Sequence, residues 1–213
     1  MTHKLFWQDP YLARIETFLT AVHGSDVTVD STIFFAESGG QESDHGTIGG
    51  RPVLGAHWQG SEIVYTLEEG SGLKVCDPVW IVIDWERRYR LMRLHFAAEI
   101  VLALVYQNLA PIEKIGAHIS AEKARLDFLW GRSIAEAVPL LGTQAQRLID
   151  ADLEIISAFS DEAAERRYWR IEGFAQVPCG GTHLRSTGEV GAITLKRENP
   201  GKGKERIEIT LHD

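Results

Sequence analysis

The feature that most constrains this fold is one long stretch, residues 85–109, that contains neither glycine nor proline. It reads WERRYRLMRLHFAAEIVLALVYQNL, is rich in helix formers and places apolar residues three and four positions apart. This spacing is typical of a helix with a broad apolar face. We therefore expect a single long, mostly buried helix around which the remaining chain has to pack.

Strand-like segments flank this helix on both sides. Before it lie VTVDSTIFF, PVLGAHW, SEIVYTL and PVWIVIDW, which are short, rich in β-branched and aromatic residues, and separated by glycine or proline. They predict a small antiparallel β unit over residues 1–82. After the helix, AHISAEKARLDFLW predicts a hairpin, residues 143–169 a second helix that starts at Thr143, and GAITLKRENPGKGKERIEITL a closing hairpin.

Together these segments predict an α+β chain with two parts. Residues 1–82 form a β-rich, small barrel-like N-terminal subdomain that includes a glycine-rich loop. We expect residues 83–213 to form a second, α/β domain, in which an antiparallel sheet packs on long helices.

Composition and charge limit where the chain works and what it binds. The opening MTHKLFWQDPYLARIE lacks the basic start and apolar centre of a secretion signal, and no later segment approaches the roughly 18 uncharged apolar residues of a membrane span. We therefore expect a cytoplasmic protein without a membrane partner. The formal net charge of -8 argues against indiscriminate binding to a polyanion such as DNA.

Two local basic segments stand out against this acidic background. DWERRYRLMR includes Arg87 and Arg88, and KRENPGKGKER includes Lys202 and Lys204. On charge alone they favour a solvated helix face and a solvated hairpin loop.

Two short motifs carry possible ligands for a metal ion. CGGTH offers the thiol of Cys179 and the imidazole of His183, and HFAAE places His95 and Glu99 one helical turn apart on the same face. The four side chains offer one sulfur, two nitrogens and one oxygen, a plausible tetrahedral set for zinc. Taken singly, CGGTH is also compatible with a plain turn, and the helix pair with a surface hydrogen bond or a satisfied core histidine.

A third motif is the glycine-rich loop SGGQ, residues 38–41. Gly39 and Gly40 permit positive φ and a close approach of the backbone to a ligand, and Gln41 offers both a donor and an acceptor. The motif lacks the spacing of a nucleotide-phosphate loop, so an ordinary turn remains the alternative.

The chain resembles the editing module of alanyl-tRNA synthetases and its free-standing AlaX relatives. The resemblance runs from LFWQDPYL to the final strand, through FFAESGGQESDHGTI, DWERRYRLMRLHFAAE, GAHISAEKARLDF and GFAQVPCGGTHLRSTGEVGAITLKRENPGKGKERIEITL. In that family an HxxxH pair on a helix and a later CxxxH pair hold the metal. Transferred by position, the resemblance implies the ligand set His95, Glu99, Cys179 and His183.

Glu99 departs from the family pattern, because it stands where the second histidine is usual. A carboxylate also binds zinc, but it lowers the net charge of the site by one and weakens its Lewis acidity. If Glu99 is not a ligand, His95, Cys179 and His183 leave a fourth position open. Both arrangements are compatible with the sequence.

The resemblance implies an ATP-independent hydrolase that serves translation fidelity. Its expected substrate is tRNA(Ala) mischarged with serine or glycine, and its expected cofactor is Zn2+, which could activate the attacking water, orient the substrate, or both. Thr32 is the candidate reader of the serine hydroxyl. The candidate substrate-binding residues are Thr32, Gly39, Gly40 and Gln41, and the candidate RNA contacts are Arg87, Arg88, Lys202 and Lys204.

Two other functional classes remain open from the sequence. A metal-dependent hydrolase of another small ester or amide needs the same site but no RNA surface. A non-catalytic RNA-binding module needs a structural zinc, closed by four protein ligands.

Overall fold

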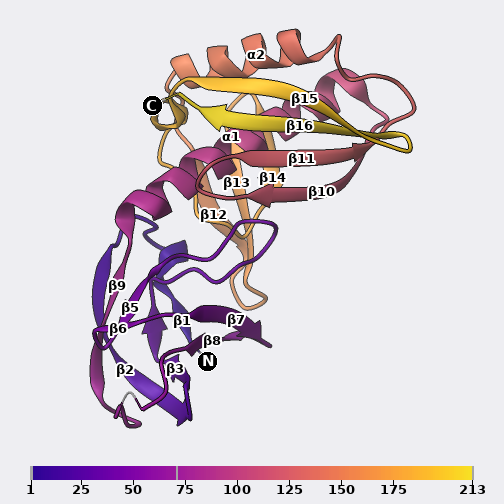
Figure 1. The fold of residues 1–213 in the computed structure, drawn as a ribbon. Helices are drawn as coiled ribbons and strands as arrows, with labels where there is room; N and C mark the ends of the chain where they lie inside the picture. Colours follow the sequence, from indigo (N-terminus) through magenta and orange to yellow (C-terminus); the bar gives the residue numbers. More distant parts are fainter. Residues whose placement is uncertain (1, 71, 213) are drawn as a thin grey trace. The chain divides into compact units, whose positions relative to one another are not determined.

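The computed structural model describes residues 2–70 and 72–212, and Figure 1 shows its elements. Within these residues the fold is α+β, with two α-helices and mostly antiparallel sheets, as the sequence predicted. The chain divides into two compact units. The first comprises Met1–Ser38 and Glu42–Tyr89, and the second comprises Gly39–Gln41 and Arg90–Asp213.

The first unit contains a sheet of seven strands in the order β6-β5-β9-β2-β3-β8-β7. The long strand β2 pairs with β9 along its first half and with β3 along its second half, antiparallel in both cases. The strands are β2 (Arg14–His23), β3 (Asp26–Val29), β5 (Gly46–Ile48), β6 (Arg51–Pro52), β7 (Gly55–Gln59), β8 (Glu62–Thr66) and β9 (Pro78–Ile83). Two short strands, β1 (His3–Lys4) and β4 (Ser31–Thr32), pair in parallel, and the 3-10 helix η1 (Leu5–Trp7) follows β1.

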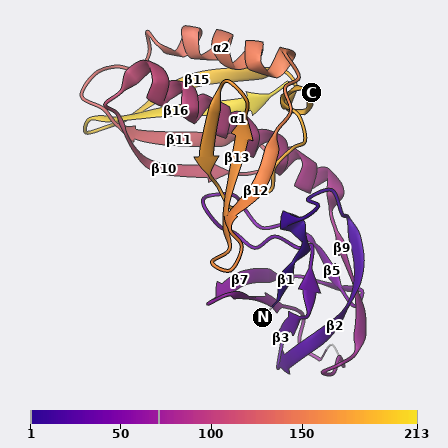
Figure 2. The ribbon, with the colours of Figure 1, turned by 180° about the vertical axis from the view of Figure 1, so that it is seen from behind.

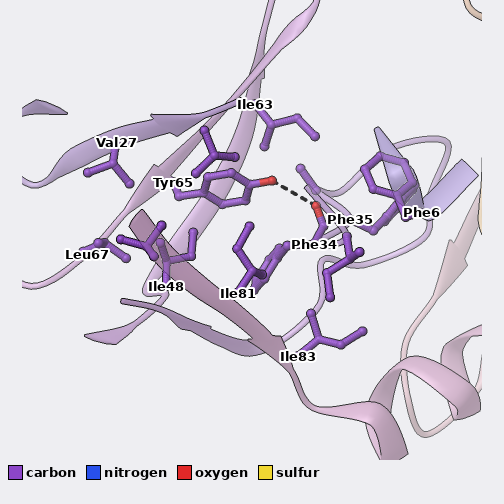
Figure 3. Packing of buried hydrophobic residues seen from close by; sticks show 14 of the residues in the cluster. Phe6, Val27, Phe34, Phe35, Ile48, Ile63, Tyr65, Leu67, Ile81 and Ile83 are labelled. Carbon is purple, nitrogen blue, oxygen red and sulfur yellow. Dashed lines mark hydrogen bonds between the residues drawn. The ribbon is translucent and has the colours of Figure 1, made fainter. Parts of the chain in front are cut away.

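Alternating burial along the strands builds the core of this unit. In β9 the sequence PVWIVI buries every second side chain, so Val79, Ile81 and Ile83 lie inside. Figure 3 shows these isoleucines with the phenylalanines of the IFF segment and with Tyr65. The buried hydroxyl of Tyr65 donates a hydrogen bond to the carbonyl of Phe34 at 3.1 Å, so its polar end is satisfied.

The second unit contains two sheets and both α-helices. A four-stranded sheet has the order β10-β11-β16-β15, and a three-stranded sheet has the order β12-β13-β14. Its strands are β10 (Glu113–Ile119), β11 (Ala124–Leu129), β12 (Ile156–Asp161), β13 (Arg166–Ile171), β14 (Ala175–Pro178), β15 (Ile193–Gly201) and β16 (Lys204–Leu211). The helices are α1 (Trp85–Leu109), whose first turn belongs to the first unit, α2 (Val138–Asp150) and the 3-10 helix η2 (Thr187–Val190).

The long helix expected at residues 85–109 is confirmed as α1, and the two expected hairpins are confirmed as β10–β11 and β15–β16. Figure 2 shows the three-stranded sheet beside α1. The contact is aromatic, since the rings of Phe96 on α1 and Trp169 on β13 have centroids 5.3 Å apart. This packing brings β13 and the segment after β14 against the middle of the helix.

The prediction for the second helix is wrong in its position. Residues 143–169 do not form one helix; α2 ends at Asp150, and residues 162–165 form the turn between strands β12 and β13. The charged run DEAAERR therefore lies in a hairpin. Asp161 accepts the backbone N–H of Ala164, and Glu165 has a φ of 52°, which ends any helical path there.

Within residues 2–70 and 72–212, no helix combines the length and the apolar character that a bilayer span requires.

Candidate metal centre

Helix α1 supplies the first half of a polar cluster. His95 and Glu99 lie one turn apart in a segment whose neighbours Phe96, Ala97 and Ala98 are buried. His95 is itself 5% exposed, and its Nε2 lies 3.5 Å from Oε1 of Glu99. Two ionisable side chains in such an apolar helix need polar partners to offset the loss of hydration.

The loop after β14 supplies the second half. The backbone N–H of Cys179 donates to the carbonyl of Arg167 at 3.0 Å, which anchors the start of the loop to β13. Cys179 Sγ lies 3.3 Å from His95 Nε2 and 3.7 Å from Glu99 Oε1. The ligand atoms of His95, Cys179 and His183 all lie within 4.8 Å of one another, so the structure brings the two motifs together.

A glycine makes this approach possible. A Cβ atom added to Gly181 would lie 1.8 Å from Cε1 of His95 and 2.9 Å from Oε1 of Gln41. Any other residue would therefore displace the imidazole or the loop. A Cβ added to the preceding Gly180 meets nothing within 4 Å, so the two glycines of CGGTH are not equivalent.

Three of the four side chains, His95, His183 and Glu99, also have an outer partner. The Oε1 atom of Gln41 lies 2.5 Å from His95 Nδ1, and Ser157 Oγ lies 2.8 Å from His183 Nδ1. The indole of Trp169 donates to Oε2 of Glu99 at 2.8 Å. These contacts leave the Nε2 atoms of both histidines on the inner side of the cluster.

Charge and burial set the protonation of the cluster in the metal-free protein. Burial alone would lower the pKa of His95, but the negative charge of Cys179 and hydrogen bonds to Cys179 and Glu99 raise it to about 10. Burial, with the positive charges of His95 and Arg167, holds the pKa of His183 well below its usual range. Burial would raise the pKa of Glu99, but hydrogen bonds from His95 and Trp169 lower it.

The residues fit a metal ion. His183 Nε2 is buried and has no hydrogen-bond partner within the described part of the chain, although Nδ1 of the same ring is bonded to Ser157. A buried polar atom without a partner is costly, and coordination to a metal would satisfy it. One thiolate and two imidazoles are a donor set that borderline-soft divalent ions favour. His95, Cys179 and His183 can therefore hold a metal ion, with Glu99 close to two of the three.

The glycine-rich loop is joined to the same unit. Gly40 has a φ of 92°, and a Cβ on it would lie 2.6 Å from the carbonyl oxygen of Ala117. The carbonyl of Gly40 accepts the N–H of Ile119 at 2.7 Å, and Gln41 forms a parallel bridge with Ile119. Gly39, with a φ of 63°, makes the turn that leads into this contact.

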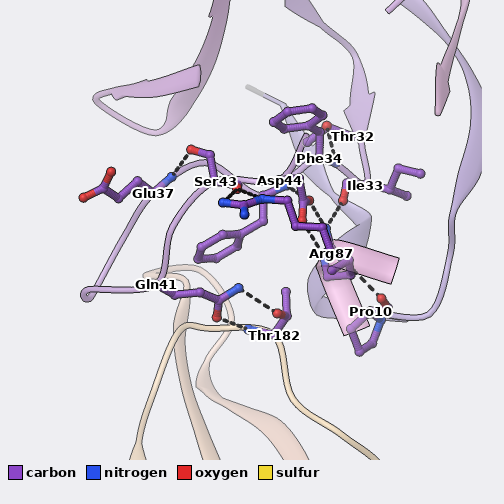
Figure 4. Close-up of polar contacts among 12 residues, drawn as sticks. Pro10, Thr32, Ile33, Phe34, Glu37, Gln41, Ser43, Asp44, Arg87 and Thr182 are labelled. Carbon is purple, nitrogen blue, oxygen red and sulfur yellow. Dashed lines mark hydrogen bonds and ion pairs between the residues drawn. The ribbon is translucent and has the colours of Figure 1, made fainter. Parts of the chain in front are cut away.

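The buried side chain of Gln41 contacts the loop that carries Cys179 and His183. Figure 4 shows its amide beside Thr182, where Nε2 of Gln41 donates to the threonine Oγ1 at 2.9 Å. Gln41 is 1% exposed.

Thr32, the candidate hydroxyl reader, is buried in the first unit. Its Oγ1 accepts the N–H of Phe34 at 3.0 Å (Figure 4). The same oxygen lies 2.7 Å from the hydroxyl of Tyr65. Since the Tyr65 hydroxyl donates to the Phe34 carbonyl, the Thr32 hydroxyl is the donor to Tyr65. Both of these bonds serve the packing of the unit.

The candidate RNA contacts differ in accessibility. Lys202 and Lys204 are exposed at the turn between β15 and β16. The guanidinium of Arg87 is partly covered and donates to Glu42 at 2.6 Å. Arg88 is fully buried and pairs with both carboxylate oxygens of Asp44, so its position leaves it outside any RNA surface.

Sequence patterns do not single out the outer partners Ser157 and Trp169. Each lies on an ordinary strand, and its role depends on which residue the fold places opposite it. Thr182 is different, because it stands inside CGGTH between two candidate ligands. Its position next to His183 was a usable signal for a residue that supports the site.

Comparisons with known proteins match the chain over most of its length and include the segment that carries Cys179 and His183. The family model for the threonyl and alanyl tRNA synthetase second additional domain matches residues 167–208, which include Cys179 and His183. An alanyl-tRNA editing protein AlaX-M from Pyrococcus horikoshii is 31% identical over 99% of this chain and 98% of its own length. The AlaX-M protein of Methanosarcina acetivorans is 32% identical, with 100% of both chains covered.

A longer relative shows a second context for the same domain. The alanine–tRNA ligase of Methanococcus aeolicus is 32% identical over 98% of this chain, which corresponds to 25% of the ligase. Relatives of this chain thus occur both as proteins of about its own length and as one part of a longer ligase. The chain belongs to the AlaX-M family of alanyl-tRNA editing proteins.

Proposed function

We propose that this protein is a trans-editing hydrolase, which deacylates tRNA(Ala) that carries the wrong amino acid. The observation that carries the proposal is the convergence of His95, Cys179 and His183 in a chain that AlaX-M proteins match over its full length. The substrates we propose are seryl-tRNA(Ala) and glycyl-tRNA(Ala). A pocket built for alanine rejects both poorly, because one is smaller and the other adds only a hydroxyl, so a second hydrolytic site is needed.

The cofactor we propose is zinc, held by His95, Cys179 and His183, with Glu99 either as a fourth ligand or beside an open fourth position. When bound, zinc supplies Lewis acidity toward the ester carbonyl or the attacking water. The protein residues fix the positions of the side chains around the metal site. Gly181 brings the loop against α1, and the carboxylate of Glu99 is held between His95 and Trp169.

Arg167 adds a fixed positive charge next to the loop. Its guanidinium donates to the carbonyl of Gly181 at 3.1 Å, and burial lowers its pKa to about 10, so it stays protonated at neutral pH. This charge stabilises any negative charge that develops beside the loop during ester hydrolysis.

For tRNA we propose contacts at Arg87 in the first unit and at Lys202 and Lys204 in the second. The exposure of the two lysines supports this, whereas the interior position of Arg88 removes it from the set. Phosphate contacts would make the reaction rate fall as salt rises. A translation substrate also fits the predicted cytoplasmic location.

For the domain organisation we propose that residues 1–82 and 83–213 are the functional parts, since α1 starts at Trp85 and carries both helix ligands. We further propose a barrel-like closure of the first sheet. Its two edge strands, β6 and β7, are separated in the sequence by only Val53 and Leu54.

The decisive experiment is a deacylation assay with Ser-, Gly- and Ala-tRNA(Ala), with and without a chelator. We expect hydrolysis of the first two, little hydrolysis of Ala-tRNA(Ala), and loss of activity on chelation that added zinc restores. Activity on a small ester at a rate insensitive to tRNA and salt would favour another hydrolase. Metal binding without any deacylation would favour a structural site.

A further inference from the structure

Gln41 uses both polar atoms of its side chain in contacts with His95 and Thr182. Its Oε1 atom lies 2.5 Å from His95 Nδ1 and 3.3 Å from the backbone nitrogen of Thr182. Its Nε2 atom donates to the hydroxyl of Thr182. The side chain is 1% exposed, so the amide is directed into the protein.

These contacts fix which atom of the Gln41 amide faces His95. A backbone N–H can only donate, so the atom that Thr182 N contacts has to be the carbonyl oxygen, Oε1. The same oxygen faces His95 Nδ1, which must therefore carry a proton and donate it. In a neutral imidazole the lone pair is then on Nε2, the atom that lies 3.3 Å from Cys179 Sγ.

Gln41 also connects the two halves of the cluster. Through His95 it contacts helix α1, and through Thr182 it contacts the loop that carries Cys179 and His183. The backbone of the glycine-rich loop is itself fixed to β10 by the Gly40–Ile119 hydrogen bond. One buried side chain therefore joins the imidazole to the loop.

We propose that Gln41 is a positioning residue for the metal ligand His95, which holds the imidazole with Nε2 toward the metal, and that it does not read the substrate. This inference rests on the proposed metal site. It assigns a structural reason to the glycines of SGGQ, because Gly40 lets the backbone reach β10 and places Gln41 against the cluster. Outer partners of this kind typically alter metal affinity by about 10–100-fold.

The test compares three variants of the full chain. Gln41→Leu removes both polar atoms at similar volume, Gln41→Glu keeps an acceptor for His95 Nδ1, and Thr182→Val removes only the hydroxyl that Nε2 of Gln41 contacts. The measurements are zinc affinity by competition with a chelator, the absorption spectrum of the cobalt-substituted protein, and the ratio of seryl to glycyl deacylation rates.

We expect Gln41→Leu to bind zinc about 10–100-fold more weakly and to change the cobalt spectrum. Gln41→Glu should keep the zinc affinity within about threefold of the parent and leave the cobalt spectrum unchanged, because a carboxylate also accepts a hydrogen bond from imidazole. Thr182→Val should weaken zinc binding less than Gln41→Leu does. The seryl-to-glycyl ratio should stay unchanged in all three.

The inference is overturned if Gln41→Leu binds zinc as tightly as the parent, or if its seryl-to-glycyl ratio changes at unaltered affinity. A parent protein that binds no zinc would overturn both this inference and the metal site. A parent that binds zinc but deacylates nothing would overturn only the proposed activity. Thermal unfolding of the metal-free variants shows whether any loss reflects misfolding instead.

Discussion

Glu99 is held from two sides, next to His95 and Cys179. One carboxylate oxygen lies 3.5 Å from His95 Nε2, and the other accepts the indole N–H of Trp169 at 2.8 Å. The second contact orients the first oxygen toward the ligands, as outer partners of metal ligands do. Glu99 is thus close to His95 and Cys179, but it is not among the three side chains whose ligand atoms all lie within 4.8 Å of one another, so its role as a fourth ligand is a question for substitution.

Substitution of Glu99 separates the two arrangements that the sequence left open. Glu99→His should keep zinc, because imidazole reaches the same face of α1. Glu99→Ala should lower zinc affinity by about 100-fold or more, beyond the roughly 10–100-fold typical of losing an outer partner. Competition with a chelator measures both variants side by side, and an alanine variant as tight as the parent would show that Glu99 does not coordinate.

The role of Thr32 can be tested by replacing its hydroxyl with a methyl group. Thr32→Val deprives the Phe34 N–H and the Tyr65 hydroxyl of a buried partner, so we expect a loss of roughly 1–3 kcal/mol in the free energy of unfolding. If Thr32 also reads serine, seryl-tRNA(Ala) hydrolysis should slow more than glycyl-tRNA(Ala) hydrolysis. Equal slowing of the two would leave Thr32 only its role in packing.

At the scale of elements, the sequence predicts structure well where pattern and length agree. Residues 85–109 have a helical repeat too long for a strand, and they form α1. The prediction fails at residues 143–169, where good helix formers in DEAAERR lie in a turn. Strand pairing of Ile156–Asp161 with Arg166–Ile171 overrides local propensity there, and propensity alone cannot reveal it.

The loop between β14 and η2 gives a prediction with an internal control. Gly181→Ala adds a methyl group 1.8 Å from His95 Cε1, whereas Gly180→Ala adds one that meets nothing within 4 Å. Neither position has a positive φ, so backbone strain does not separate them. Zinc affinity should fall at least about tenfold for Gly181→Ala and stay near the parent for Gly180→Ala. Equal affinities would mean that the loop moves freely away from α1.

At the scale of the whole molecule, the sequence predicts the candidate metal ligands but not the residues that hydrogen-bond to them. Spacing alone places His95 and Glu99 on one helix face and Cys179 and His183 in one short loop. The contacts of Gln41 with His95 and of Ser157 with His183 join segments that only the folded chain brings together. Pairing of distant segments depends on tertiary packing, which carries no local pattern.

The proton on His95 links metal binding to the stability of the whole protein. Its pKa of about 10 in the metal-free protein lies above its ordinary value of 6.5, so charged His95 stabilises the folded state. That stabilisation is fully present below pH 6.5 and is lost as the pH rises through about 10. His183 has the opposite sign: its pKa is lowered, so it is neutral at pH 7 and costs stability only as the pH falls below 6.5.

We therefore expect opposite pH dependences for folding and for metal binding. Between pH 7 and 9, the unfolding free energy of the metal-free parent should fall relative to that of His95→Asn, which lacks the titrating group. Over the same range, zinc affinity should rise about tenfold per pH unit, because coordination through Nε2 releases the His95 proton. Urea unfolding after chelation measures the unfolding free energy. Competition with a chelator, corrected for the protonation of the chelator, measures the zinc affinity. A zinc affinity independent of pH would show that His95 is already neutral before the metal binds.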